Sequence, residues 1–182
     1  KALGYNKITF AYNSLKIAKA NPLYKQKYEP KNDAVKVEIA VIIQSSKKEE
    51  VRALAIQASR SQIKPLALSM GGMFDRFVLE KTEVAGLVNA EIVQPKDHLH
   101  FRRSGIDQVS AKLAKENGKI FVASLAVLLG TRFNHSKVLG MIMQNKSFSK
   151  KYKFDYFLAS FADDPYDMRG ASDMKSLLVC FG

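Results

Sequence analysis

Hydrophobic and polar positions change their period several times along the chain, from the close spacing of strands to the wider spacing of helices. Short apolar runs rich in β-branched side chains predict buried strands. Segments with apolar residues three and four positions apart predict helices with one face in the core. Strands are expected at 8–12, 35–43, 65–69, 84–88, 119–124 and 154–160. Helices are expected at 47–59, through Arg76 and Glu80, and at 105–117, 134–145 and 171–181.

Strands and helices alternate along the whole chain, with polar segments between them. This alternation is typical of parallel strands covered by helices, that is, of the α/β class. Six strands in this order fit a (β/α) barrel and also an open doubly wound sheet, and hydrophobic periodicity does not distinguish the two. A length of 182 residues suits one domain over 1–182, and a hydrophobic share of 47% is enough for a core.

Composition excludes several classes of protein. Charged residues make up 25% of the chain, which excludes a disordered polycation. The single cysteine, Cys180, excludes an internal disulfide framework and indicates a reducing compartment. We expect Cys180 in the core, beside Leu177 and Leu178. The longest uncharged apolar run, Ile120 to Leu129, is too short for a bilayer, which needs about 20 residues. No secretory signal is visible, so we expect a soluble intracellular protein without a membrane partner.

The net charge of +12 is too positive for an ordinary soluble protein of this size. Nucleic acid is the most common partner of such a chain, while an acidic membrane or a merely soluble surface also fits. No acidic residue lies between Glu116 and Asp155, whereas seven basic residues do: Lys119, Arg132, Lys137, Lys146, Lys150, Lys151 and Lys153. A solvated helix face usually mixes both signs, so a phosphate backbone is a plausible counter-charge.

A second basic region lies between Lys16 and Lys36, interleaved with Tyr24 and Tyr28. Its turn-forming residues predict a loop. Such a loop is suited to single-stranded RNA, which binds through charge and stacking, and it also fits a plain soluble connector.

No catalytic constellation is visible. Gly71 and Gly72 lack the spacing of a dinucleotide fingerprint, and no phosphate-binding loop is present. His98 and His100 have only His135 as a further histidine, so we interpret them as surface residues and assign no metal site. We likewise assign no catalytic residue and no bound cofactor. The serines at predicted strand ends lack an elbow motif or a His/Asp partner; they are Ser69, Ser124 and Ser160.

Arginines stand at the predicted strand-to-helix connections. Arg102 and Arg103 precede the helix expected at Gly105, Arg169 precedes the last helix, and Arg76 lies near the start of the short one. Helix N-termini attract phosphate, and parallel α/β folds bind ligands at this end of the sheet. Each arginine also fits a capping or salt-bridge role, for example Arg169 with Asp167 or Asp173. The predicted RNA-binding residues are Arg76, Arg102, Arg103, Arg132, Lys146, Lys150, Lys151, Lys153 and Arg169.

The segment from Arg103 through Asp107 and on to Asn117 has the pattern R-x-G-I-D … A-K-E-N. This pattern looks like a helix of the archaeal and eukaryotic ribonuclease P protein component 3 family, which the chain resembles most specifically here. The similarity continues in the strand 121–125 and in a closing pattern. That pattern consists of 157–162, Pro165, Arg169, Gly170, Asp173, Leu177, Phe181 and Gly182. Weaker similarity lies at Leu3-Gly4-Tyr5 and at Gly71, Gly72, Arg76 and Glu80.

The resemblance implies a TIM-barrel-like fold of the polymerase-and-histidinol-phosphatase (PHP) type without its metal site. It implies a protein subunit of ribonuclease P, the endoribonuclease that removes the 5′ leader of precursor tRNA. In that family the RNA performs the hydrolysis with its own magnesium, and the implied partners are ribonuclease P RNA, precursor tRNA, the component 2 subunit and other ribonuclease P proteins. The implied location is the cytoplasm for an archaeal protein and the nucleus for a eukaryotic one.

Two departures from the family pattern stand out. Family members have a further strand before Leu3, so we expect a barrel that lacks its first strand. Archaeal members usually have a proline just after the last arginine, where this chain has Gly170 and Ala171. Two other functions stay open on the residues alone: a PHP-superfamily metal-dependent phosphoesterase, which would bind a divalent metal, and a protein-interaction scaffold with only weak affinity for RNA.

Overall fold

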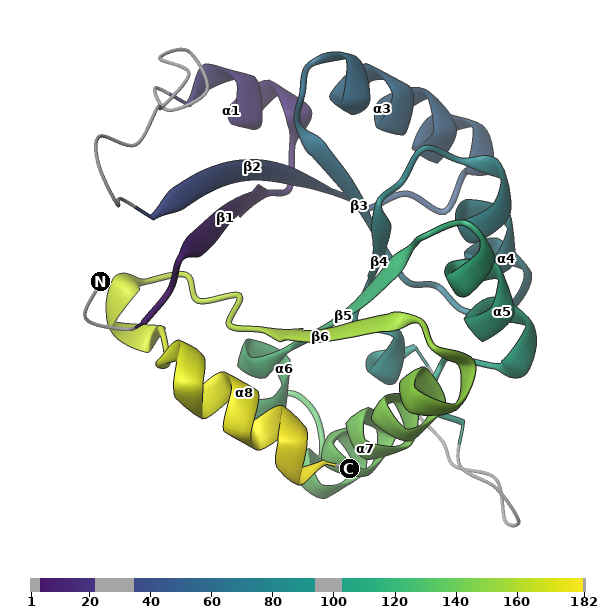
Figure 1. The fold of residues 1–182 in the computed structure, drawn as a ribbon. Helices are drawn as coiled ribbons and strands as arrows, with labels where there is room; N and C mark the ends of the chain where they lie inside the picture. Colours follow the sequence, from purple (N-terminus) through teal and green to yellow (C-terminus); the bar gives the residue numbers. More distant parts are fainter. Residues whose placement is uncertain (1–3, 22–34, 94–102, 182) are drawn as a thin grey trace.

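Six parallel strands form one curved sheet with helices on its outer side (Figure 1). The computed structural model describes residues 4–21, 35–93 and 103–181. The strands are β1 (Lys7–Tyr12), β2 (Lys36–Ile43), β3 (Lys64–Leu68), β4 (Gly86–Val88), β5 (Ile120–Ser124) and β6 (Asp155–Ala159). The helices are α1 (Leu15–Ala20), α3 (Lys48–Arg60), α4 (Gly72–Lys81), α5 (Gln108–Glu116), α6 (Leu125–Leu129), α7 (His135–Tyr152) and α8 (Ala171–Cys180). Two 3-10 turns are η1 (Ala90–Ile92) and η2 (Pro165–Asp167).

The strand order distinguishes the two architectures that the sequence leaves open. The strands pair in chain order, β1-β2-β3-β4-β5-β6, and every pairing is parallel. A doubly wound sheet would reverse its order at a switch point. Sequential order with the helices on the outside is instead the arrangement of a (β/α) barrel. The expectation of a TIM-barrel-like fold is therefore confirmed, with six strands in a partial barrel.

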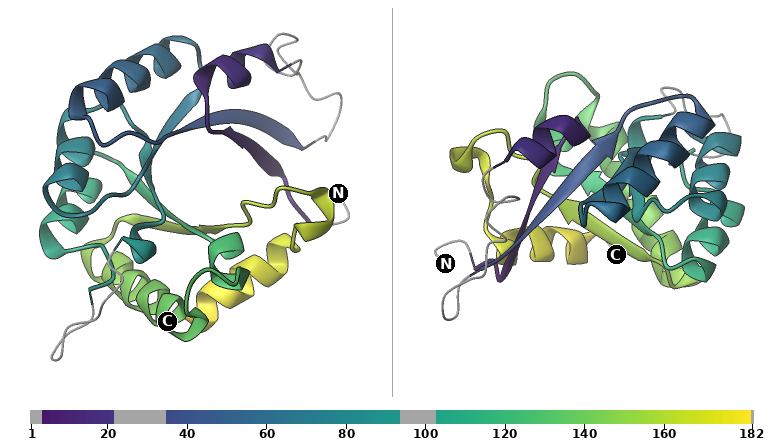
Figure 2. Two further views of the ribbon diagram at one scale, coloured as in Figure 1. Left: turned by 180° about the vertical axis from the view of Figure 1, so that it is seen from behind. Right: turned by 90° about the horizontal axis from the view of Figure 1, so that it is seen from above.

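Among the described residues, the edge strands β1 and β6 are not paired with each other. The segments that precede β1 and α8 nevertheless lie side by side (Figures 1 and 2). The Tyr5 hydroxyl donates a hydrogen bond of 2.7 Å to the backbone oxygen of Arg169. This hydrogen bond therefore connects the segment before β1, at one edge of the sheet, with the segment that follows β6 at the other edge.

Apolar side chains fill both faces of the sheet. The larger cluster lies between the sheet and the helices and contains Phe121, Ile63, Leu79 and Leu87, each at most 1% exposed. The smaller cluster faces the inside of the barrel and consists of Ala40, Leu66, Val88 and Val122. Burial on both faces explains why the strands are nearly continuous apolar runs rather than alternating ones.

Helix boundaries differ from the sequence prediction at three places. The helix α7 continues to Tyr152 instead of ending at Asn145, because Phe148 and Tyr152 keep the apolar spacing and pack edge to face at 5.8 Å. The helix α5 begins at Gln108 and not at Gly105. The short helix α1 occupies the start of a region predicted as a loop.

Cys180 is exposed, so the prediction that it lies in the core was wrong. It stands in the last turn of α8, where Val179 is also 67% exposed. Met174 supplies the fully buried contact of this helix instead. No helix in the part of the chain that the structure describes is long and apolar enough to cross a membrane.

Candidate nucleic-acid interface

The predicted RNA-binding residues fall at two opposite ends of the sheet. We call the end where the strands begin, with the last helix turns beside it, the amino-terminal rim, and the opposite end the carboxy-terminal rim. Four of the arginines lie at the carboxy-terminal rim, in α4, in strand-to-helix connections or between α6 and α7: Arg76, Arg103, Arg132 and Arg169. The four lysines lie toward the amino-terminal rim, at the end of α7: Lys146, Lys150, Lys151 and Lys153. Arg102 lies outside the described residues.

The length of α7 separates its terminal lysines from the arginines of the carboxy-terminal rim. This helix has 18 residues, and at about 1.5 Å per residue it spans about 27 Å. Arg132 precedes its first turn, while Lys150 and Lys151 stand in its last. The acid-free stretch is continuous in sequence, but the fold places its charges at both ends of the sheet.

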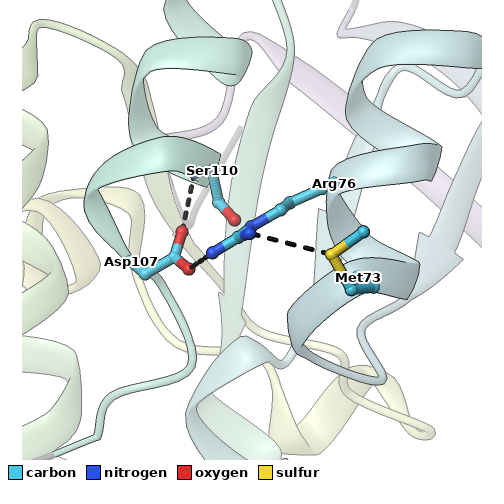
Figure 3. Close-up of polar contacts among 4 residues, drawn as sticks. All are labelled: Met73, Arg76, Asp107 and Ser110. Carbon is cyan, nitrogen blue, oxygen red and sulfur yellow. Dashed lines mark hydrogen bonds and ion pairs between the residues drawn. The ribbon is translucent and has the colours of Figure 1, made fainter.

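Arg76 contacts another helix rather than solvent alone (Figure 3). Its Nη2 lies 2.5 Å from Oδ2 of Asp107, the N-cap residue of α5. The other oxygen of Asp107 accepts a hydrogen bond of 2.7 Å from the backbone N–H of Ser110. These hydrogen bonds and the guanidinium hold the pKa of Asp107 below its usual value, although partial burial opposes them. The pair connects α4 with the start of α5.

Asp107 was not assigned a role from the sequence. The signal was present, because Asp is a preferred N-cap immediately before an apolar-periodic segment. It was missed because Gly105 was taken as the start of the helix. Gly105 has a φ of +88°, and a Cβ there would lie 1.9 Å from the carbonyl oxygen of Ala90. Arg103 therefore stands in a connection four residues before the cap, and not at the helix start.

The first turn of α4 contains a buried carboxylate. Asp75 is 1% exposed and accepts hydrogen bonds from the Ser69 hydroxyl and from the backbone N–H of Met70, at 2.5 and 2.9 Å. Burial raises its pKa, although the hydrogen bonds oppose that effect. Ser69, noted at a predicted strand end, thus supports the turn.

A second buried carboxylate, Glu91, lies in η1 and is 4% exposed. It accepts a hydrogen bond from the Tyr156 hydroxyl and another of 3.1 Å from the Asn145 amide, which also donates to Ser104 O at 2.9 Å. Burial raises the pKa of Glu91 and, together with that carboxylate, raises the pKa of Tyr156. The sequence does not predict this cluster, because Glu91 lies between the strand expected at 84–88 and the helix expected at 105–117.

The lysines at the end of α7 stand on a rigid support. Tyr152 packs against Phe148, and the ammonium of Lys151 lies 5.4 Å above the Tyr152 ring. Phe154 is buried and packs edge to face on Phe121 at 5.4 Å. Lys150, Lys151 and Lys153 themselves are exposed.

Lys153 has an unusual backbone for its residue type. It is the C-cap of α7 with φ 58° and ψ 43°, the left-handed conformation usually taken by glycine or asparagine. For another L-residue this conformation costs roughly 1 kcal/mol. The chain therefore accepts backbone strain at a position that carries a positive charge.

Lys119 has a structural contact and is only partly exposed. Its Nζ donates a hydrogen bond of 3.0 Å to the backbone oxygen of Thr82, and burial lowers its pKa. It thus connects the start of β5 with the end of α4. Of the seven basic residues in the acid-free stretch, this one has a clear role in packing.

Within residues 4–21, 35–93 and 103–181, no group of three or more His, Cys, Asp or Glu side chains is placed to hold a metal ion. His135 contacts the Gly130 carbonyl oxygen through Nε2 at 2.7 Å. His98 and His100 lie outside the described residues. A pocket of about 580 Å³ opens at the carboxy-terminal rim between α1 and α3, lined in part by Lys16, Lys19, Gln44 and Glu50.

Comparisons with known proteins identify a sequence relative and a solved structure of similar fold. No protein-family model matches the chain. It is 27% identical over 136 residues to ribonuclease P protein component 3 of Methanococcus maripaludis, a match that covers 74% of this chain and 56% of the relative. The fold matches a chain in a cryo-EM structure of archaeal ribonuclease P with mature tRNA, with a TM-score of 0.78 and 17% identity. That match covers 99% of this chain and 75% of the other.

These two matches agree with the motifs at Arg103–Asp107 and at the end of the chain. The chain spans little more than half of its sequence relative, whereas the fold is matched almost throughout. The chain is therefore similar in sequence to a ribonuclease P protein component 3 and similar in fold to a chain of an archaeal ribonuclease P structure.

Proposed function

We propose that the chain is a protein subunit of ribonuclease P that binds RNA and does not itself perform the cleavage. The observation that supports this most is the combination of a net charge of +12 with a fold matched over 99% of the chain by a protein from an archaeal ribonuclease P structure. The sequence relative has the name of the same enzyme's component 3.

Lysine and arginine side chains would act in this role by neutralising phosphates. Each phosphate contact releases condensed counterions, which makes the affinity depend strongly on salt. Neutralisation would also lower the magnesium concentration that the folded RNA needs. The proposed partners are ribonuclease P RNA, precursor tRNA, the component 2 subunit and the other protein subunits, with magnesium bound by the RNA and none by this protein.

Reconstitution of precursor tRNA cleavage tests this function. The isolated protein is expected to leave precursor tRNA intact, while its addition to ribonuclease P RNA and the remaining subunits raises cleavage at low magnesium. Robust cleavage by the protein without RNA, with a stoichiometric divalent metal in the purified sample, would contradict the proposal and favour a metal-dependent phosphoesterase. No effect on the reconstituted cleavage would favour a protein-interaction scaffold.

A further inference from the structure

We propose that RNA phosphates bind at the amino-terminal rim, around Lys150, Lys151 and Lys153, and not at the carboxy-terminal rim where barrel enzymes usually bind their ligands. This inference rests on the proposed function, and it identifies the surface that performs it. It also reverses the sequence-based expectation for the arginines, which placed the RNA at the strand-to-helix connections.

Charge is distributed unequally between the two rims. At the amino-terminal rim basic residues clearly outnumber carboxylates. The basic ones are Lys7, Lys36, Arg60, Lys64, Lys81, Lys115, Lys119, Lys150, Lys151 and Lys153. The carboxylates there are Glu38, Glu80, Glu83, Glu116 and Asp155. A polyanion would therefore meet a positive potential at this end.

At the carboxy-terminal rim the excess of positive charge is smaller. The basic residues there are Lys16, Lys19, Lys47, Lys48, Arg52, Arg76, Arg103, Arg132, Lys137, Arg169 and Lys175. The carboxylates outside the core are Glu49, Glu50, Asp107, Asp163, Asp164, Asp167 and Asp173. Several of these carboxylates stand in first helix turns, where the helix dipole favours them, and they would repel phosphate.

Ion pairs occur at both rims. Arg76 is paired with Asp107 at the carboxy-terminal rim, and Lys7 and Lys36 are both paired with Glu38 at the amino-terminal rim. In contrast, no described carboxylate lies within salt-bridge distance of Lys150, Lys151 or Lys153. The last turn of α7 thus presents charge that the described part of the fold leaves uncompensated.

The left-handed backbone of Lys153 does not by itself indicate binding, because the uncharged Gln62 and Phe161 also have a positive φ. Asparagine or glycine would end the helix here with less strain. A lysine here strains the backbone but extends the positive surface beyond the end of the helix. We infer that the charge of Lys153 serves binding rather than folding.

The first test compares two triple variants in RNA binding across a range of salt concentrations. Lys150→Gln, Lys151→Gln and Lys153→Gln together are expected to weaken binding of ribonuclease P RNA at least tenfold at about 0.1 M salt. They should also reduce the slope of log affinity against log salt by about 2, since each phosphate contact contributes about 0.7–0.9. The matched control carries Lys47→Gln, Arg52→Gln and Lys175→Gln, exposed basic residues of the other rim, and is expected to keep the wild-type slope.

The second test removes one charge without harming the fold. Lys153→Asn keeps a residue that tolerates the left-handed backbone, so the unfolding midpoint should stay or rise while RNA affinity falls several-fold. Gln62→Asn is the matched control, because Gln62 also has a positive φ of 56° in a connection at the same rim but carries no charge. It should keep full affinity.

The outcomes separate this inference from the function on which it rests. If the wild-type protein binds ribonuclease P RNA and the control triple variant loses the salt slope while the α7 variant keeps it, the rim assignment is wrong and the function stands. If the wild-type protein shows no salt-dependent binding of this RNA, the proposed function itself fails. A folded Lys153→Asn protein with wild-type affinity would also overturn the role of that lysine.

Discussion

Arg76 and Asp107 join two neighbouring helices through one ion pair, with Nη2 and Oδ2 2.5 Å apart. The same carboxylate caps α5 through the Ser110 N–H, so one side chain fixes both the start of a helix and its neighbour. Arg76 is among the residues predicted to bind RNA phosphate. Its contact with Asp107 nevertheless gives it a function in the fold.

Asp107→Ala is expected to destabilise the protein by about 1–2 kcal/mol, because it removes a helix cap and leaves Arg76 without its partner. Asp107→Asn should cost less, since asparagine caps helices well. Urea unfolding at neutral pH measures both. Equal losses for the two variants would show that the ion pair, and not the cap, dominates.

The Asp107 carboxylate should also make the stability of the fold depend on pH in the acid range. Its pKa is lower in the folded protein than in the unfolded chain, where Asp has about 3.9. Its contribution is therefore complete above about pH 4 and is lost as the pH falls through the lower folded value. Below pH 4, we expect the free energy of unfolding of Asp107→Asn to fall less steeply with pH than that of the wild type. Equal slopes below pH 4 would contradict this.

Glu91→Gln should change the pH dependence of stability in the opposite direction. Burial raises the pKa of Glu91 above the unfolded value of about 4.3, so its favourable contribution is present below that value and is lost as the pH rises. The variant keeps an oxygen that accepts from Tyr156 and Asn145 but has no proton to lose. We expect a flatter stability profile above pH 4.3, with a difference of at most about 1.4 kcal/mol per pH unit.

Urea midpoints between pH 4.5 and 8 measure this difference. The matched control is Glu116→Gln, an exposed glutamate in the last turn of α5, which should reproduce the wild-type slope. If the urea midpoints of the wild type and of Glu91→Gln change equally with pH, folding does not raise the pKa of Glu91.

Gly105→Ala is expected to cost about 2 kcal/mol or more. Its Cβ would lie 1.9 Å from the Ala90 carbonyl oxygen, on a backbone with φ +88°. Gly118→Ala has a similar positive φ of +59° but no atom within 4 Å of the added Cβ, so it should cost only about 1 kcal/mol. Thermal unfolding compares the two, and similar losses would argue against the close approach of η1 to Gly105.

The sequence predicts most of the fold because the strands are largely apolar and the helices alternate with them. Barrel and open sheet become distinguishable only through strand order, which depends on how helices and strands pack in three dimensions. Hydrophobic spacing also predicts the wrong end for α7. Asn145 looks like a helix end, but its buried amide donates hydrogen bonds to Glu91 and to the Ser104 carbonyl oxygen.

The candidate site is less predictable, because charge along the sequence does not show where a helix ends in space. Arg132 and Lys150 belong to one acid-free stretch and lie at opposite ends of the sheet. The ion pair of Arg76 requires a partner 31 residues away, which no local pattern indicates. The strained backbone of Lys153 is likewise invisible in the sequence.

Co-purification from the source cells tests the central claim most directly. The tagged chain is isolated at low salt, and the RNA and proteins bound to it are sequenced, with a tagged unrelated barrel of similar charge as control. The account predicts enrichment of ribonuclease P RNA and of other ribonuclease P proteins, and their loss at high salt. Recovery of the chain without ribonuclease P RNA, or with no more of it than the control barrel, would contradict the account.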